Sequence, residues 1–285
     1  MRTLVQPGPV HPSRIESFGG GVSAMIFTAR AGQSLNEAVT GPLAAAGWRS
    51  GTVTITGGAM NPFRYVMPGP ADDASHAAYF TAPRAPAGTT RLELANATFG
   101  FAGAAPFLHC HAVWTEPDGA RRGGHILPAE TILASDIEVH AWGFTAITIE
   151  TADDPETNFT LFQPHGEPGP GAADVVARKR PGVVARVRPN EDITLAVETI
   201  ARTHGLRDAT VRGSLGSLIG ARFTDGTVVT DHATEVLVRE GWVRGGVAML
   251  DLVVVDMQGR VREGRLVRGQ NAVLITFDVV LDATG

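Results

Sequence analysis

The feature that most constrains this sequence is an internal repeat. Residues 32–65 align without a gap with residues 190–223, at an offset of 158 positions. Residues 109–139 align in the same way with residues 249–279, at an offset of 140 positions. Glycines and apolar residues coincide in both alignments, which indicates one structural unit present in two copies. The chain is therefore expected to fold as two similar halves.

The first copy is longer than the second. Because the offset falls from 158 to 140, the first copy contains about eighteen extra residues. These residues must lie between Tyr65 and His109, where the segment 67–88, MPGPADDASHAAYFTAPRAPAG, is rich in Pro, Ala and Gly. Such a composition is typical of a loop. The segment 67–88 is therefore the predicted insertion.

Each copy has the pattern of one helix followed by strands. Ser34 and Asn190 are candidate N-caps, and apolar residues then recur at helical spacing. Gly47 and Gly205 are expected to end the two helices. The strands that follow are joined mostly by hairpins and read GTVTITG, RLELANATFGF and ASDIEVHAWGF in the first copy, and DATVRGSLG, EVLVREGWV and NAVLITFDVVL in the second. The expected fold class is α+β, with two tandem copies that each contain a mostly antiparallel sheet and one main helix.

Composition supports two ordered domains. The chain has 285 residues, of which 44% are hydrophobic and 19% are charged, so each copy can bury a core. We expect an N-terminal extension over residues 1–21, a first domain over 22–150 and a second domain over 180–285. Residues 151–179 are rich in Pro, Gly and acidic side chains, and we expect them to form the linker.

Several classes of protein fit this sequence poorly. Cys110 is the only cysteine, so an intrachain disulfide cannot form. The first residues lack an apolar signal core, and no apolar run approaches the roughly 20 residues of a membrane-spanning helix. The net charge is -5 and no basic stripe is present, so a nucleic-acid partner is not expected. A cytoplasmic location is the expectation.

Three of the nine histidines lie within residues 109–125, HCHAVWTEPDGARRGGH. His109 and His111 are two residues apart on an expected strand, so they share one face of it. The Pro-Asp-Gly sequence at 117–119 predicts a hairpin in which paired residue numbers sum to 236. His111 then faces His125, with Cβ atoms about 5 Å apart. The pattern predicts one metal site formed by the three histidines.

The second copy lacks all three of these histidines. Met249, Asp251 and Arg265 stand at the positions of His109, His111 and His125, while the turn glycine and the apolar pattern remain. This joint replacement is what loss of a metal would produce. We therefore expect one metal per chain, a degenerate site in the second domain, and an ion pair between Asp251 and Arg265.

The chain resembles the plants-and-prokaryotes conserved (PPC) domain family, also called the domain of unknown function 296 family. Four motifs carry the resemblance: GSLGSLIGA and EVLVREGWV in the second copy, and HCHAVWTEPDGARRGGHI and ASDIEV in the first. Together they cover roughly residues 22–150 and 180–283.

The resemblance implies an α+β fold, association as a homotrimer, and a divalent metal, usually taken as zinc. His109, His111 and His125 match the family's metal-binding positions. Plant members bind DNA through separate segments with an Arg-Gly-Arg-Pro core, and this sequence contains no such core.

An alternative reading is the cupin metal motif. Gly103, His109, His111, Glu116 and Gly123 fit the spacing of the first cupin motif, with Glu116 as a ligand. Cupins are barrels with a second downstream motif that ends in His, and such a motif is not found here. The helix-first repeats also fit a barrel poorly.

Three histidines leave a fourth metal position open, as in catalytic zinc sites. Glu138 is the candidate acid or base, or the carboxylate that orients a histidine, and His140 shares its face. Arg64 and Arg222 are candidate binding residues for a substrate carboxylate. Arg121 and Arg122 are weaker candidates for the same role.

The function expected is that of a metal-dependent lyase, hydratase or hydrolase acting on a small carboxylate. The alternative is a binding or regulatory module whose metal has no catalytic role. A second-copy domain of a neighbouring subunit is expected to help wall the site in the homotrimer.

Overall fold

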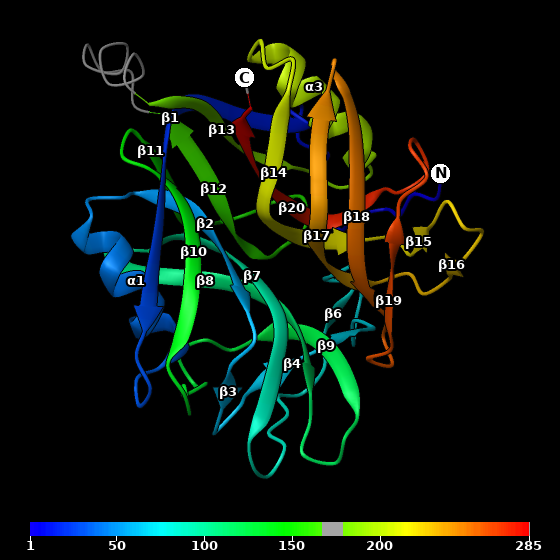
Figure 1. The fold of residues 1–285 in the computed structure, drawn as a ribbon. Helices are drawn as coiled ribbons and strands as arrows, with labels where there is room; N and C mark the ends of the chain where they lie inside the picture. The colour runs from blue at the N-terminus through cyan, green and yellow to red at the C-terminus, as the bar shows by residue number, and fades with distance from the viewer. Residues whose placement is uncertain (167–178, 285) are drawn as a thin grey trace.

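The structure is a computed structural model that describes residues 1–166 and 179–284 (Figure 1). The first copy contains one helix and twelve strands, counted over the described residues. They are β1 Ile15–Ala29, α1 Leu35–Ala45, β2 Ser50–Thr56, β3 Ala59–Met60, β4 Tyr65–Val66, β5 Pro68–Gly69, β6 Tyr79–Phe80, β7 Thr90–Ala102, β8 Ala105–Thr115, β9 Arg121–Ile126, β10 Ile137–Phe144, β11 Ile147–Asp153 and β12 Thr160–Gly166.

The second copy repeats this plan with fewer short strands. Its elements are β13 Arg180–Val187, α3 Ile193–Thr203, β14 Ala209–Leu218, β15 Ala221–Arg222, β16 Val228–Val229, β17 Thr234–Arg244, β18 Val247–Val255, β19 Val261–Arg265 and β20 Val273–Ala283. Among the described residues, no helix has both the length and the apolar character that crossing a membrane needs.

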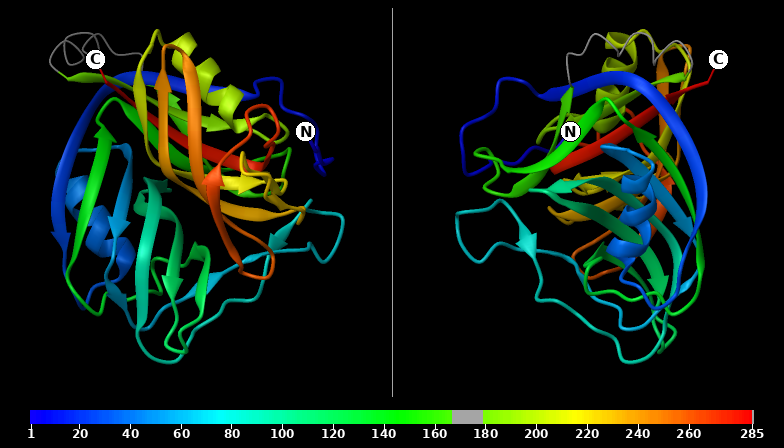
Figure 2. Two further views of the ribbon diagram at one scale, coloured as in Figure 1. Left: turned by 45° about the vertical axis from the view of Figure 1, so that its right-hand side comes forward. Right: turned by 90° about the vertical axis from the view of Figure 1, so that its left-hand side faces the viewer.

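The strand order is the same in both copies. The first follows β1-β10-β2-β7-β8-β9 and the second follows β13-β20-β14-β17-β18-β19, and neighbours along both paths are antiparallel. With one helix in each copy, this order confirms the predicted α+β fold of two tandem copies. β1 pairs with β13 through its first half and with β10 through its second half, so one sheet runs through both copies. Figure 2 shows β1, in blue, curving along both halves.

Both helices begin at a capping side chain and end before a glycine. Ser34 accepts a hydrogen bond from the backbone N–H of Glu37, as the sequence predicts. In the second copy the cap is Asp192 and not Asn190. Asn190 instead has a φ of 66° and hydrogen-bonds the backbone of Leu4 through its side chain, so the helix begins two residues later.

Each copy has its own hydrophobic core, and three further clusters join the copies. The core of the first copy packs under α1 and that of the second packs under α3. One joining cluster contains Ile149 and Phe162 of the first copy together with Val184 and Val280 of the second. In another, Val113 of β8 packs among second-copy residues. The face of β8 that carries the histidines therefore lies close to the second copy.

A β-bulge lets β14 approach the first copy closely. The bulge follows Arg212, and Gly213 within it has a φ of 44°. The Gly213 carbonyl accepts a hydrogen bond of 2.7 Å from the hydroxyl of Thr52 on β2. A Cβ at position 213 would overlap this hydroxyl and would lie 2.8 Å from the carbonyl oxygen of Val53. A glycine is therefore needed where the two copies touch.

Two segments that the sequence predicts to lie outside the two domains contain strands. Residues 15–21, in the predicted N-terminal extension, belong to β1. Residues 151–153 end β11 and residues 160–166 form β12, although the sequence assigns both to the linker. The rest of the predicted linker includes residues 167–178, which lie outside the described residues.

Candidate metal centre

The hairpin of β8 and β9 has the predicted register. His111 pairs with His125, and Ala112 pairs with Gly124. Cys110 points to the opposite face, where it lies in the core of the first copy. Burial raises the pKa of its thiol to about 12, so it is not a ready thiolate ligand.

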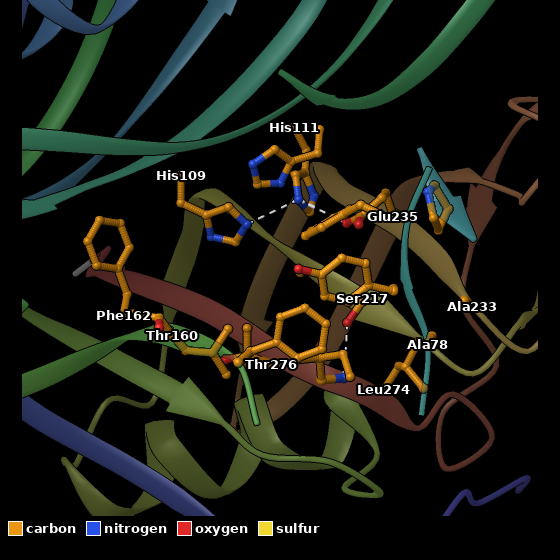
Figure 3. Close-up of a pocket in the computed structure, with 18 of the residues that line it drawn as sticks. Ala78, His109, His111, Thr160, Phe162, Ser217, Ala233, Glu235, Leu274 and Thr276 are labelled. Atoms are coloured by element: carbon orange, nitrogen blue, oxygen red, sulfur yellow. Dashed lines mark hydrogen bonds and ion pairs between the residues drawn. The ribbon is translucent and has the colours of Figure 1, made fainter. Parts of the chain in front are cut away.

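The three histidine rings converge on one point. Their potential ligand atoms all lie within 4.8 Å of one another, and they form a cluster that could hold a metal ion. The Nε2 atoms of His109 and His111 are 3.1 Å apart. The ring centre of His125 lies 5.2 Å from each of the other two ring centres. Figure 3 shows His109 and His111 pointing toward each other at one end of a pocket.

The second copy supplies hydrogen-bond partners for two of these rings. His109 Nδ1 lies 3.0 Å from a carboxylate oxygen of Asp278 on β20. His111 Nδ1 lies 3.0 Å from the carbonyl oxygen of Val236 on β17. Because a carboxylate and a carbonyl only accept, each Nδ1 must carry the hydrogen and donate it.

These partners leave a lone pair on the Nε2 of each neutral ring. Two lone pairs 3.1 Å apart need a proton or a cation between them. Tetrahedral zinc, with Zn–N of about 2.0–2.1 Å, holds its ligand nitrogens about 3.3 Å apart. The separation and the tautomers of His109 and His111 therefore fit a divalent metal, and a carboxylate behind a ligating histidine is the usual arrangement.

His125 completes the donor set. Its Nδ1 is buried and has no hydrogen-bond partner among the described residues. Burial, and then the neighbouring His109 and His111, hold its pKa well below the ordinary value. The ring is therefore neutral at physiological pH, which is the state that binds metals.

Glu235 is the carboxylate nearest to His111. It lies at the second residue of β17, and its Oε2 is 2.9 Å from His111 Nε2. Burial lowers the pKa of His111, but the charge and hydrogen bond of Glu235 outweigh this and raise it. Without a cation, a protonated His111 donates to Glu235, and a metal would take the place of that proton.

The triad opens into a pocket of about 260 Å³ between the two copies. The first copy contributes residues of the insertion and of β11 and β12, and the second contributes residues of β14, β17 and β20. The lining of the pocket includes Ala78, Phe80, Phe107, Phe159, Phe162 and Glu235.

The structure does not bring Glu138 to the triad. Glu138 is 67% exposed on β10, where its carboxylate lies 2.8 Å from Nε2 of His140. β2 and β7 separate β10 from β8, which puts Glu138 about 14 Å from the histidine strand at the usual strand spacing. Glu138 and His140 share a face, as predicted, and the register puts it on the same side of the sheet as His111, but neither residue lines the pocket.

The candidate arginines also lie elsewhere. Arg64 lies 3.3 Å from Glu130, and Arg222 is exposed on β15. Arg121 forms ion pairs with Glu93 and Glu263, and Arg122 lies 3.5 Å from Glu116. Among the described residues that line the pocket, none is Arg or Lys.

Glu116 does not act as the cupin reading requires. Its carboxylate accepts a hydrogen bond of 2.6 Å from the hydroxyl of Tyr65 and does not belong to the histidine cluster. The open sheet that runs through both copies, with a helix on each copy, is also not a cupin barrel. The cupin alternative is therefore wrong.

The second-copy hairpin has the predicted register but a different ion pair. Asp251 pairs with Arg265 across β18 and β19. Its carboxylate, however, lies 2.8 Å from the guanidinium of Arg239 on β17, and that is the ion pair formed.

Sequence reasoning missed Glu235 and Asp278. Asp278 could have been found, because the alignment at offset 140 matches it with Glu138. Glu235 begins the motif EVLVREGWV, but local sequence does not place it at the triad, since it reaches His111 only through the packing of one copy on the other.

Neither a protein-family model nor a curated protein matches the sequence. Solved structures do match it. A plant- and prokaryote-conserved (PPC) protein from Pyrococcus horikoshii is 13% identical over 54% of this chain and 97% of its own, with a TM-score of 0.40. A metal-containing protein from Archaeoglobus fulgidus is 17% identical over 50% of this chain and 93% of its own, with a TM-score of 0.39. A candidate DNA-binding protein from Bacteroides thetaiotaomicron is 13% identical over 49% of this chain and 91% of its own, with a TM-score of 0.40. Each match covers about half of this chain.

Proposed function

We propose that this protein is a metal-dependent enzyme, either a hydrolase or a lyase of the hydratase kind. One observation supports the proposal above all: three converging imidazoles form the end of a pocket and have a buried carboxylate, Glu235, beside them. Structural zinc sites are closed by four protein ligands, whereas a site of three histidines is typical of catalytic zinc.

His109, His111 and His125 would hold one divalent metal, and zinc suits a set of three imidazoles. When bound, such a metal acts as a Lewis acid that polarises a carbonyl oxygen or lowers the pKa of a coordinated water. Asp278 and the Val236 carbonyl fix the tautomers and the ring orientations of His109 and His111. The second copy is therefore part of the metal site although it has lost its own ligands.

Glu235 is the proposed general base. Its Oε2 lies 2.9 Å from His111 Nε2 at the edge of the pocket, within reach of a proton on a reacting group beside the triad. Its side chain is 8% exposed, so few waters compete for that proton. Glu138 is not proposed for this role because it lies outside the pocket.

The substrate proposed is a small carboxylate or related carbonyl compound that places an oxygen at the triad. No arginine lines the described pocket, so a carboxylate would be bound through the metal and not through Arg64 or Arg222.

A binding module is the second candidate. The 2.9 Å contact of Glu235 with His111 Nε2 favours it, because this carboxylate is near enough to become a fourth ligand and close the site.

The test uses the full-length chain loaded with zinc and a panel of small carboxylic acids, hydroxy acids and esters, with turnover followed by NMR. Glu235→Gln should abolish turnover and retain one zinc per chain. Glu240→Gln, an exposed change on the same strand, should alter neither. The enzyme proposal fails if no panel member is turned over and Glu235→Gln also loses the zinc, since Glu235 would then be a closing ligand.

A further inference from the structure

We infer that the site takes a small molecule with an uncharged, apolar body of about one ring, joined to an oxygen-bearing head that faces the triad. This inference rests on the proposed function, because it presumes an open metal position for the head. It adds the class of body and the segments of the chain that select it.

The pocket is mostly apolar away from the histidines, and the other polar side chains in its described lining, apart from Glu235, carry uncharged serine, threonine and tyrosine hydroxyls. Four phenylalanines line it together with leucine, isoleucine and alanine side chains, and Glu235 is the only acidic residue among the described lining residues. A cavity of about 260 Å³ is slightly below the range for drug-sized ligands. A body with phosphates or further carboxylates would meet no cation here except the metal, and desolvating those groups would disfavour binding.

The phenylalanine rings stand directly beside the triad. The ring centre of Phe80 is 5.1 Å from that of His125, and the ring centre of Phe162 is 6.4 Å from that of His109. Phe107 in turn contacts Phe162, with ring centres 5.9 Å apart. A head group held at the three imidazoles therefore has its body placed among aromatic side chains (Figure 3).

Three of the four phenylalanines lie on segments that depart from the repeat, while Phe107 lies on the shared strand β8. Phe80 belongs to the insertion, residues 67–88, and Phe159 and Phe162 belong to the β11–β12 region that the sequence assigns to the linker. Residues that both copies share build the sheet that runs through the two copies. The aromatic part of the pocket wall is therefore formed largely by additions to the first copy, which retains the histidines.

The insertion and the β11–β12 region, which are the two additions to the first copy, contact each other directly. Tyr79 stacks on Phe159 with ring centres 5.5 Å apart, and the Asn158 side chain donates a 2.9 Å hydrogen bond to the Ser75 carbonyl. Ala78 is buried with Ile219 and Ala233 of the second copy, so the insertion also contacts the second copy.

The experiment compares two probes with the same metal-binding head. Acetohydroxamate and benzohydroxamate are titrated by calorimetry into the zinc-loaded full-length chain, with the zinc-free chain as the blank. Benzohydroxamate should bind at least about tenfold more tightly, because only its ring can bury apolar surface against the phenylalanines. Phe80→Ala should cut this preference to less than about threefold, whereas Phe101→Ala, a half-buried phenylalanine outside the pocket, should preserve it.

The outcomes separate this inference from the proposed function. Equal binding of both hydroxamates to the zinc-loaded chain would overturn the apolar body and leave the open metal site standing. Binding of neither probe, with one zinc present per chain, would overturn the open site and the inference with it. If Phe80→Ala does not fold, the preference of the unchanged chain and that of Phe80→Leu decide the question.

Discussion

His111 is the residue at which the two copies depend on each other most. It belongs to the first copy, yet Val236 and Glu235 of the second copy contact its two ring nitrogens. It is 2% exposed, so water cannot readily replace either contact, and losing one would leave a buried polar atom unpaired. Its ring is held in one tautomer and one orientation, which is a condition for a tight metal site.

The first prediction concerns Asp278. Asp278→Asn keeps the size of the side chain but removes the charge that holds the Nδ1 hydrogen of His109. Zinc affinity should fall about 10- to 100-fold while the fold persists. A competition titration with a chromophoric chelator measures the affinity. Asp251→Asn, at the position that matches His111 in the second copy, should leave it unchanged, and equal affinities in both variants would contradict the role of Asp278.

At the scale of single residues, the sequence predicts the candidate metal ligands better than it predicts the residues that hydrogen-bond to them. The alternation of side chains along β8 and the turn at 117–119 suffice to pair His111 with His125. The supporting carboxylate was expected at Glu138, but its counterpart Asp278 faces the triad. The repeat makes the two positions equivalent, and only the packing of the copies decides which of them meets a histidine.

Among the elements, the turn between β11 and β12 ties the first copy to β13. Asp154 in this turn is buried, and its Oδ2 forms ion pairs with Arg186 and with Arg188, the latter at 2.6 Å. Its Oδ1 accepts the backbone N–H groups of Glu156 and Thr157. Burial disfavours the charge of Asp154, but these partners outweigh it and lower its pKa to about 2.

The second prediction is that Asp154→Asn lowers the free energy of unfolding by about 3–5 kcal/mol. Two buried guanidinium groups would lose their common carboxylate, and an uncompensated buried charge costs about that much. Urea unfolding at neutral pH measures the effect. The neighbouring exposed change Asp153→Asn should shift the free energy by less than about 0.5 kcal/mol.

The ion pairs of Asp154 with Arg186 and Arg188 also make the stability of the fold depend on pH. The pKa of Asp154 is depressed in the folded state, so its stabilisation is fully present above the ordinary value of 3.8. It decreases as the pH falls through that value toward 2, by roughly 2–3 kcal/mol in all. The stability difference between the unchanged chain and Asp154→Asn should therefore shrink from pH 5 to pH 2. A difference that stays constant over this range would refute the assignment.

The helices and strands that the sequence predicts correctly are those in which apolar residues recur with a clear helical or strand period. Both helices and the six strands quoted above lie where the sequence predicts them. The additional long strand β1 contains Gly19, Gly20 and Gly21, and β12 follows a Pro- and acid-rich turn, so their local signals are those of loops. Pairing with β13 and with β11 makes them strands, and such tertiary pairing is not visible in local sequence.

For the whole molecule, the close approach of the two copies is the main structural condition for the site. Gly213 allows β14 to lie against β2, and the neighbouring strand β17 brings Glu235 and Val236 to His111. The homotrimer stays a prediction. We predicted that a second-copy domain of a neighbouring subunit helps to enclose the triad. In the structure the second copy of the same chain does so, and Arg222 does not line the pocket.

The third prediction tests this approach. Gly213→Ala should destabilise the chain by about 1–3 kcal/mol more than Gly205→Ala, and it should weaken zinc binding. Both glycines have a positive φ, but a Cβ at 205 meets open space and one at 213 meets Thr52 and Val53. Thermal unfolding with and without zinc gives both quantities. Similar losses in the two variants would mean that the copies can separate at Gly213 without harm to the site.

The most direct test of the account is anomalous diffraction at the zinc edge from crystals of the full-length chain grown with zinc. The account predicts one anomalous peak per chain, about 2.0–2.1 Å from a nitrogen of each of His109, His111 and His125. It also predicts that Asp278 remains hydrogen-bonded to His109 behind the metal. A chain that binds zinc at another place, or that shows no peak at these three histidines, would contradict the central claim that two unequal copies build one metal site.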